Sequence, residues 1–440
     1  MLLQPARVVV LAFVALIATG TTLLSLPAAH APGRSTSLLE AVFTATSAVC
    51  VTGLVVVDTA THWSVFGQVV ILALIQIGGF GVMTLGSLVA LFLSRRIGIR
   101  LRMRARTEAG AVSLGDVKRL VKVIAVVTVA VEAVAAIALT LEFARTSDLG
   151  WRDSAWHGLF HSISAFNNAG FSLNSDSLVG FVHNWWVIGT IAATVVVGGL
   201  GFPVVIDIWD RRLRPRVWSL HTKITVATSA FLLVTGMFGV LLFEWSNEAT
   251  IGEFALHEKL LAATFHSVNT RTAGFNSVDT GAMNETTLFA SDGLMLIGGG
   301  SASTAGGIKV TTFVLLAFVI WAEVRGRRDV EAFDRRIETG LQRQALSVAL
   351  IAVGVVVLGT LGVVAFSGVE LSAGLFEVTS AFGTVGLSTG ITPTLDAASQ
   401  VVLIALMLIG RVGPLTFGAA LVLASHPRRY RRPSEGLMIG

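Results

Sequence analysis

Long apolar stretches alternate with short basic loops along the chain. Eight of these stretches approach or exceed twenty residues, the length that crosses a hydrocarbon layer of roughly 30 Å as a helix. They predict spanning helices at about 6–28, 63–94, 117–143, 184–209, 218–245, 288–321, 345–366 and 400–424. A β-barrel would instead show alternating segments of about ten residues. The pattern therefore predicts an all-α integral membrane protein.

A shorter apolar segment lies between the two members of each helix pair. These segments cover about 37–49, 151–166, 254–268 and 371–382, a length typical of re-entrant or interfacial helices. The repeating unit is therefore a helix, a half-helix with a glycine loop, and a second helix. We expect pore unit 1 at 1–95, unit 2 at 115–210, unit 3 at 217–323, unit 4 at 341–426 and a cytoplasmic tail at 427–440.

Each half-helix ends in a related loop that closes on glycine. The loop begins with Phe, passes through small and hydroxyl residues, and closes on Gly53, Gly170, Gly274 or Gly386, which are 117, 104 and 112 residues apart. A second motif follows these glycines by 26, 29, 25 and 25 residues, at Gly79, Gly199, Gly299 and Arg411. Two motifs that repeat together predict four tandem units in pseudo-fourfold arrangement around one pore, all in the same orientation.

Basic residues gather on one face of the predicted bundle. Two spans per unit return the chain to the same side, and the loops there, with Arg7 and the tail, hold 25 of the 32 Lys and Arg residues. The opposite face holds four: Arg34, Arg145, Arg152 and Lys259. The positive-inside rule then places both termini in the cytoplasm and the protein in the plasma membrane. It explains the net charge of +5 better than binding to nucleic acid does.

Composition agrees with this class of protein. Hydrophobic residues make up 53% of the chain and charged residues 13%, against about 25% charged in soluble domains. The single cysteine, Cys50, excludes an internal disulfide and a cysteine-cluster metal site. The first apolar stretch has some features of a signal peptide, but the same unit follows three more times, so we expect it to be the first span.

The four glycine loops together predict an ion filter. Non-helical backbone at membrane depth is tolerated only where it is buried or lines a cavity, and a ring of backbone carbonyls can replace the hydration shell of K⁺. Glycine suits such loops because a Cβ would strain the backbone and keep the segments apart. None of the candidate filter residues is charged. They are Val51, Thr52, Gly53, Asn168, Ala169, Gly170, Thr272, Ala273, Gly274, Thr384, Val385 and Gly386.

Two further features favour a cation. Each half-helix would point its negative C-terminal end inward. Carboxylates follow three of the loops, at Asp58, Asp176 and Asp279. They are candidates for an outer mouth that concentrates cations, and ordinary surface acids are the alternative.

The chain resembles the Trk/Ktr/HKT superfamily of potassium transporters, most closely its KtrB-type membrane subunits. The four units, the single glycine in each loop, the broken helix of unit 3 and the arginine in the last helix carry the resemblance over nearly the whole chain. It implies potassium uptake through a channel-like pore, with K⁺ as the transported ion. In the family, serine at the first filter glycine accompanies sodium permeability, so Gly53 favours potassium. The resemblance also implies a homodimer in membrane lipid and a cytosolic, nucleotide-binding regulatory ring of the KtrA type.

The resemblance also implies a gate beneath the filter. The family's intramembrane gating loop corresponds here to a glycine-rich break in the second helix of unit 3, and the family's pore arginine corresponds to Arg411. The candidate gate residues are Gly298, Gly299, Gly300, Ser301, Ala302, Ser303, Thr304, Ala305, Gly306, Gly307, Lys309 and Arg411. A plain helix kink, a structural tie by Arg411 and snorkelling of Lys309 to water are the alternatives.

The sequence predicts no cofactor of its own beyond the transported K⁺. The segment 307–310 lacks the Gly-Lys-Ser/Thr order of a phosphate-binding loop. His161 and His266 match one another in the repeats, and helix packing explains them better than metal binding does. Two other functions stay open. A cation-coupled secondary transporter, such as a K⁺/Na⁺ symporter, predicts inverted repeats and mid-membrane acids, which we do not find. A membrane enzyme, which is less favoured, predicts repeated nucleophile–base pairs.

Overall fold

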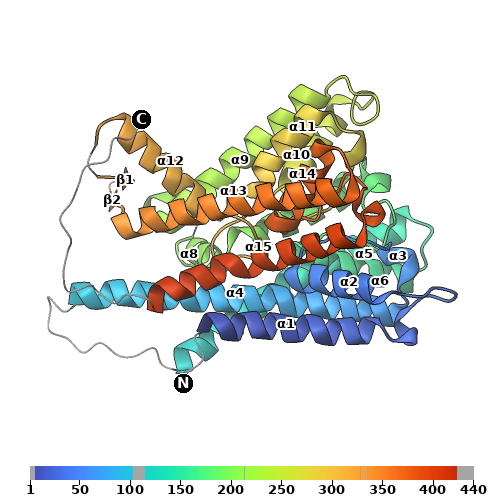
Figure 1. Ribbon diagram of the computed structural model, residues 1–440, viewed down its shortest axis with the longest axis horizontal. Helices are drawn as coiled ribbons and strands as arrows, with labels where there is room; N and C mark the ends of the chain where they lie inside the picture. The colour runs from blue at the N-terminus through green and yellow to red at the C-terminus, as the bar shows by residue number, and fades with distance from the viewer. Residues whose placement is uncertain (1–4, 103–113, 213, 328, 334, 424–440) are drawn as a thin grey trace.

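The computed structural model describes residues 5–102, 114–212, 214–327, 329–333 and 335–423. Helices dominate the described residues (Figure 1). A two-residue antiparallel pair is formed by β1 (Glu331–Ala332) and β2 (Arg335–Arg336), with Glu331 opposite Arg336. The chain is therefore all-helical in architecture, as its hydropathy predicts.

Four groups of helices follow one another, and each has a shorter helix between longer or broken ones. The first group is α1 (Pro5–Leu24), α2 (Leu38–Cys50), the single turn α3 (Thr59–His62) and α4 (Val65–Arg102). The second is α5 (Leu114–Thr146), α6 (Trp151–Asn167), α7 (Trp185–Leu200) and α8 (Phe202–Asp210). The third is α9 (Leu220–Glu244), α10 (Leu256–Asn269), α11 (Glu285–Leu296) and α12 (Val310–Val324). The fourth is α13 (Thr339–Ser367), α14 (Leu371–Gly383) and α15 (Ala397–Leu423).

The short helices α2, α6, α10 and α14 begin and end on local signals. Ser37 caps α2 by accepting the Glu40 N–H, and Glu40 accepts the Ser37 N–H at 2.6 Å, which satisfies two orphan donors of the first turn. Glu258 accepts the Ala255 N–H at 2.9 Å in the same way at the start of α10. The sequence places all four half-helices within a few residues of where the structure has them.

The four groups pack in a closed circle. The first touches the second through α4 with α5 and α6, and the second touches the third through α7 with α9 and α10. The third touches the fourth through α11 with α14 and α12 with α13. The circle closes because α15 packs on α1, α2 and α4 (Figure 1).

Several of the helices are long and apolar enough to span a membrane. In the described residues, four helices meet this test on their own: Val65–Ser87, Val121–Thr146, Leu220–Glu244 and Thr339–Ser367. The bent pair α7 and α8 makes a fifth if it is counted as one span. Val8–Leu24, Val310–Val324 and Ala397–Gly413 are shorter apolar helices. These lengths agree with a multi-pass membrane protein, while the eight-span pore stays a prediction.

The predicted helix at 184–209 is wrong in one respect. The structure breaks it at Gly201, whose φ is +92°, and α7 and α8 meet there at 96°. A Cβ on Gly201 would lie 2.5 Å from the carbonyl oxygen of Ser301, and the Phe202 N–H donates to the Ala302 carbonyl at 3.3 Å. The helix therefore breaks where a segment of the third group enters it. The break predicted in the helix at 288–321 is confirmed, between α11 and α12.

The first glycine of the second motif allows close backbone contact in three groups. A Cβ added to Gly78, Gly198 or Gly410 would come 3.0, 3.0 or 2.8 Å from the carbonyl carbon of Val49, Phe166 or Phe382 respectively. Those three carbonyls all lie four residues before a loop glycine, in the last turn of a half-helix. The long helices thus cross the half-helices with no side chain between them, which is the packing role that glycine has in membrane helices.

We expect Gly198→Ala to lower the midpoint of thermal unfolding of the detergent-purified protein, because the neighbouring Phe166 backbone cannot move aside as a side chain could. Overpacking of this kind costs about 1–3 kcal/mol. Gly189→Ala on the same helix is the matched control, since a Cβ there meets no atom within 4 Å, and alanine favours helix by up to about 1 kcal/mol. Equal midpoints for the two variants would contradict the packing role.

Candidate functional site

The four loop glycines meet in a closed ring, which we call the glycine ring. A Cβ on Gly53 would lie 3.0 Å from the Cα of Gly170, and one on Gly170 would lie 2.9 Å from the Cα of Gly274. A Cβ on Gly274 would lie 3.1 Å from the Cα of Gly386, and one on Gly386 would lie 3.1 Å from the Cα of Gly53. Residues more than three hundred positions apart are therefore neighbours, in the order that the repeat predicts.

The four loops share one backbone conformation. Every ring glycine has a positive φ, between +68° and +96°. The residue two positions earlier also has a positive φ in all four loops, at Val51, Asn168, Thr272 and Thr384. Three of these residues are β-branched, for which the left-handed region is a genuine outlier. Strain that recurs at equivalent positions indicates a constraint on the loop backbone, and such strain gathers at functional sites.

The half-helices hold the N–H groups of the loops. The Gly53 N–H donates to Ser47 Oγ at 3.0 Å, and the Gly386 N–H donates to Ser380 Oγ at 3.0 Å. In the third loop, which is one residue shorter, the Phe275 N–H donates to Asn269 Oδ1 at 3.0 Å. The second loop differs, because Ser164 Oγ donates to the Phe171 carbonyl at 2.8 Å. Each loop is thus fixed to its own half-helix by a buried polar side chain.

The carbonyl oxygens just before the ring glycines are left without partners. The residues are Thr52, Ala169, Ala273 and Val385, and all four are fully buried. Each of their oxygens lies next to the glycine of a neighbouring loop, at 3.0 Å for Ala273 and the Cβ position of Gly170. Within the described part of the chain, no donor bonds to them. Buried carbonyls normally have partners, so these four oxygens are candidate ligands for a desolvated cation, and the filter stays a prediction.

A second set of buried polar groups braces the segments around the ring. Each of the four related glycine loops begins with a Phe. The residue after that Phe is Thr44, His161, His266 or Glu377. His161 Nε2 bonds Ser172 Oγ at 3.0 Å and His266 Nε2 bonds Ser291 Oγ at 3.0 Å. These contacts agree with a packing role for both histidines, and no group of three or more potential metal ligands occurs among the described residues.

Glu377 is a site residue that the sequence analysis missed. It is fully buried and accepts hydrogen bonds from the Ser388 hydroxyl at 2.6 Å, the Thr389 N–H at 2.9 Å and the Thr392 hydroxyl at 2.7 Å. It therefore holds the segment after the fourth loop in place. Its position after the opening Phe, aligned with two histidines, is the signal that could have found it.

The three outer carboxylates cap turns of the segments that follow the loops. Asp58 accepts the Ala60 N–H at 3.0 Å, Asp176 accepts the Gly180 N–H at 2.9 Å and Asp279 accepts the Gly281 N–H at 2.9 Å. Asp58 also accepts the Ser175 hydroxyl of the second group at 2.6 Å. These contacts support a structural role, and a role in concentrating cations stays a prediction.

Residues 298–309, which we call the inner loop, join α11 to α12 and touch all four groups. The Gly300 N–H donates to Gly199 O at 2.9 Å, at the end of α7. A Cβ on Gly86 of α4 would lie 3.0 Å from the Cα of Ala302. A Cβ on Gly306 would collide with the Thr384 hydroxyl, two residues before a ring glycine. The inner loop therefore lies directly against the fourth glycine loop.

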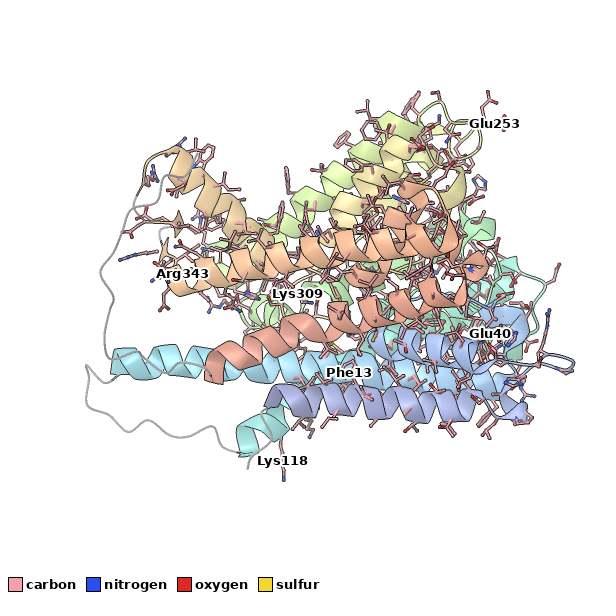
Figure 2. The ribbon with its side chains drawn as sticks, viewed as in Figure 1. Phe13, Glu40, Lys118, Glu253, Lys309 and Arg343 are labelled. Atoms are coloured by element: carbon pink, nitrogen blue, oxygen red, sulfur yellow. The ribbon has the colours of Figure 1, made fainter. Side chains whose placement is uncertain are left out.

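Two arginines and a lysine donate to inner-loop carbonyls. Arg271 Nη2 bonds Gly298 O at 2.9 Å, Arg411 Nη1 bonds Thr304 O, and Lys309 Nζ bonds Ala305 O. Arg411 is 2% exposed, and its Nε and Nη2 atoms have no hydrogen-bond partner among the described residues. Figure 2 shows Lys309 between α13 and α15, away from both ends of the bundle. Arg271 thus ties its own loop to the inner loop.

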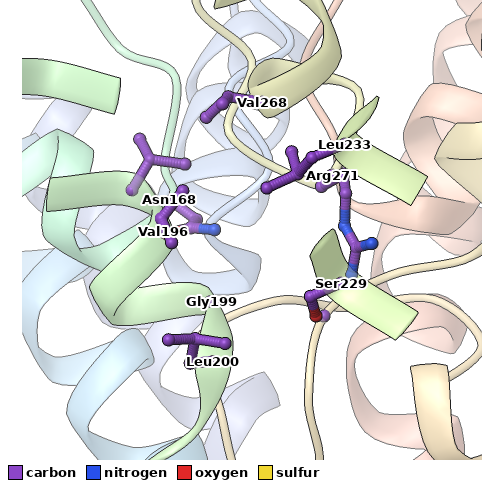
Figure 3. A pocket seen from close by; sticks show the side chains of 10 residues that line it. Asn168, Val196, Gly199, Leu200, Ser229, Leu233, Val268 and Arg271 are labelled. Atoms are coloured by element: carbon purple, nitrogen blue, oxygen red, sulfur yellow. The ribbon is translucent and has the colours of Figure 1, made fainter. Parts of the chain in front are cut away.

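A small cavity lies beside Arg271 and the start of the inner loop. Its lining includes Asn168, Gly199, Ser229, Arg271 and Gly299 (Figure 3). Arg271 Nη1 is buried and has no hydrogen-bond partner in the part of the chain that the structure describes, and Figure 3 shows the Arg271 guanidinium directed toward Ser229. The cavity thus adjoins both the second filter loop and the inner loop.

Buried acids are present in the long and short helices, which corrects one expectation. Glu132, Asp292 and Glu377 are 6%, 7% and 0% exposed. Mid-membrane acids are not expected from the sequence alone, and each of these three acids occurs in one unit only. The presence of buried acids removes one of the two arguments against a coupled transporter. The other argument is the lack of inverted repeats in the sequence.

Comparison with known proteins identifies the family. A family model described as cation transport protein, TrkH, matches residues 4–428. The chain belongs to the TrkH family. It is 41% identical to the Ktr system potassium uptake protein B of Bacillus subtilis, over 94% of this chain and 92% of that one. It is 37% identical to the potassium/sodium uptake protein NtpJ of Enterococcus hirae, over 100% and 98%. A cation transport family also decides against an enzyme.

A solved structure supports the fold of this TrkH family chain. The crystal structure of the potassium transporter TrkH from Vibrio parahaemolyticus aligns with a TM-score of 0.73 at 17% identity. The alignment covers 96% of this chain and 84% of that one. The resemblance suggested by the four loops is thereby confirmed at the level of the family and the fold.

Proposed function

We propose that this chain is the ion-conducting membrane subunit of a potassium uptake system. In this proposal the carbonyls of the four filter loops select K⁺, and the inner loop gates the pathway beneath them. The observation that carries the proposal is the ring of four buried carbonyl oxygens without donors next to the four glycines. Carbonyls arranged in this way replace the water shell of a potassium ion.

Potassium as a transported ion is supported by the names of the relatives, and glycine rather than serine at position 53 favours it over sodium. The matched proteins of Bacillus subtilis and Enterococcus hirae are named for potassium uptake and for potassium/sodium uptake. Gly53 has a φ of +96°, and a larger residue there would distort the ring. We infer that all four glycines contribute to selection, with residues 51–53, 168–170, 272–274 and 384–386 lining the filter.

The proposed pathway is surrounded by eight spans in pseudo-fourfold arrangement, with pore units at 1–95, 115–210, 217–323 and 341–426. Both termini are proposed to be cytoplasmic. The charges at the two ends of the bundle support this orientation, since Figure 2 shows Arg343 and Lys118 at one end and Glu40 and Glu253 at the other. The proposed tail at 427–440 lies outside the described residues.

The proposed gate is the inner loop held by its three cationic side chains. Arg411 and Lys309 donate to adjacent carbonyls, those of Thr304 and Ala305, and Gly306 lies against Thr384 of the filter loop. Release of these contacts would open the pathway. The proposed assembly is a homodimer in membrane lipid with a KtrA-type regulatory ring on its cytoplasmic face, because several relatives are named as components of a Ktr system.

A K⁺/Na⁺ symporter is the alternative that the buried acids support. Glu132 and Asp292 are buried carboxylates in the helices, and such groups mark ion pathways in coupled transporters. The two mechanisms differ in what drives potassium. A channel-like pore passes K⁺ down its own gradient, whereas a symporter needs Na⁺.

We expect the purified chain in liposomes to pass K⁺ or Rb⁺ down a gradient without Na⁺. Flux is measured with a potassium-sensitive dye or with isotopic rubidium, and empty liposomes are the blank. Flux that appears only with Na⁺ would favour the symporter. Absence of cation flux, with and without a regulatory ring added, would remove the proposed function.

Gly53→Ser is expected to lower the K⁺/Na⁺ permeability ratio by about tenfold, since a change of 1.4 kcal/mol in relative ion binding suffices for that factor. The added Cβ would collide with the Ala169 carbonyl, one of the four proposed ligands. Gly33→Ser is the matched control, because Gly33 also has a positive φ, +76°, but stands in open space. An unaltered ratio in Gly53→Ser would show that Gly53 does not line the filter.

Shortening the inner loop by deletion within 301–306 is expected to raise K⁺ flux in the absence of a regulator. The deletion removes the Thr304 and Ala305 carbonyls that Arg411 and Lys309 hold. Size-exclusion profiles establish folding, and the flux assay above gives the result. Unchanged or lower flux in a folded variant would count against a gate at this place.

A further inference from the structure

Two buried polar side chains, Glu132 and Asn167, meet the half-buried Gln76 at the end of the second half-helix. Glu132 of α5 accepts from Gln76 Nε2 of α4 at 3.2 Å with one oxygen and from Asn167 Nδ2 of α6 at 3.2 Å with the other. Asn167 Nδ2 also donates to Gln76 Oε1 at 2.8 Å. The cluster joins the first and second groups. In the described part of the chain, no basic side chain forms an ion pair with Glu132.

The residue type at the position of Asn167 differs in every unit. Three residues before the ring glycines are Cys50, Asn167, Arg271 and Gly383. Arg271 extends to the inner loop, and Asn167 is the one that bonds to two neighbouring long helices. Gly79 makes room for it, because a Cβ there would collide with Asn167 Oδ1.

We propose that Glu132 is a positioning residue for the second filter loop, acting through Asn167. The inference rests on the proposed function, since it assigns to Glu132 a part in ion selection. It concerns a buried acid that the proposed filter and gate do not use.

The geometry gives a direct route from Glu132 to the ring. Asn167 is the last residue of α6, and the next residue, Asn168, turns the chain into the left-handed region at φ 59°. The Asn168 N–H bonds the Ala165 carbonyl of α6 at 3.1 Å, as the equivalent N–H groups of the first and fourth loops bond their own half-helices. Within the described residues, however, the Gly170 N–H has no serine acceptor like those of Gly53 and Gly386, since Ser164 bonds the Phe171 carbonyl. The Glu132 contacts therefore fix the starting point of a loop that its half-helix holds less directly.

A single carboxylate fits this task. Its two oxygens accept from two amides at once, which sets the distance between α4 and α6. Glutamine retains the length and one acceptor oxygen, and it offers an N–H₂ group that can exchange roles with either amide. Leucine has a similar volume but removes the acceptor of the Gln76 amide and leaves Asn167 Nδ2 with its bonds to Gln76 and Ile163 only, and lost hydrogen bonds in an apolar setting are costly.

The test compares Glu132→Leu with Glu132→Gln in liposomes, with the K⁺/Na⁺ permeability ratio as the main readout and the thermal midpoint as the second. We expect Glu132→Leu to lower the ratio by about threefold or more, and Glu132→Gln to stay within about twofold of the unaltered chain. Thr360→Val is the matched control, since Thr360 is also buried but its hydroxyl bonds only within its own helix, to Val356 O. That control is expected to leave the ratio unchanged.

A purely structural role would lower the midpoint and the total flux without altering the ratio, and that result overturns the proposal. An equal fall in ratio for Leu and Gln also overturns it, because the charge would then matter rather than the hydrogen bonds. If Glu132→Leu does not fold, Gln76→Leu replaces it: a lowered ratio supports the proposal and an unaltered one overturns it. Failure of the proposed function is distinguished from failure of this inference, because the unaltered chain would then show no cation flux.

Discussion

Backbone groups inside a membrane must find partners within the protein, and the four loops at the glycine ring meet this demand on one side only. The Ser47, Ser380 and Asn269 side chains accept N–H groups of the loops. The carbonyls that precede the ring glycines have no such donor among the described residues. A chain can keep buried carbonyls free where a cation takes the place of the donor. If the ring binds a cation as proposed, the glycines, the left-handed turns and the half-helices follow from that requirement.

The same constraint explains why two helices are broken at one level. The inner loop leaves the helical pattern after Leu296, and α7 leaves it at Gly201. Each broken segment provides a hydrogen-bond partner for the other: the Gly300 N–H donates to Gly199 O, and the Phe202 N–H donates to Ala302 O. Irregular backbone is tolerated at membrane depth when it is buried in protein in this way. The two breaks therefore stabilise one another across the boundary between the second and third groups.

Much of this architecture was predictable from the sequence, because a repeat signals equivalent positions. The order of the glycine ring, the half-helices and the break before Val310 follow from the glycine motifs, which recur at the same period as the apolar segments. The break at Gly201 did not, because its cause lies in another group: a carbonyl from residue 301 occupies the space of a Cβ. Glu132 and Glu377 were not predicted for a different reason: each occurs in one unit only, so no repeat marks its position. Repeats identify what the units share, and contacts between units decide where they differ.

The differences between units follow from where the proposed selection resides. If carbonyls bind the ion, only the backbone path has to obey the fourfold pattern, and the side chains behind it are free to diverge. The position three residues before each ring glycine illustrates this, with Cys50, Asn167, Arg271 and Gly383 behind four loops of one conformation. One of these side chains ties a loop to Glu132 and another ties a loop to the inner loop. A ring that is symmetric in its backbone can thus be braced asymmetrically, and that asymmetry is compatible with the proposal that one unit carries a gate while all four select the ion.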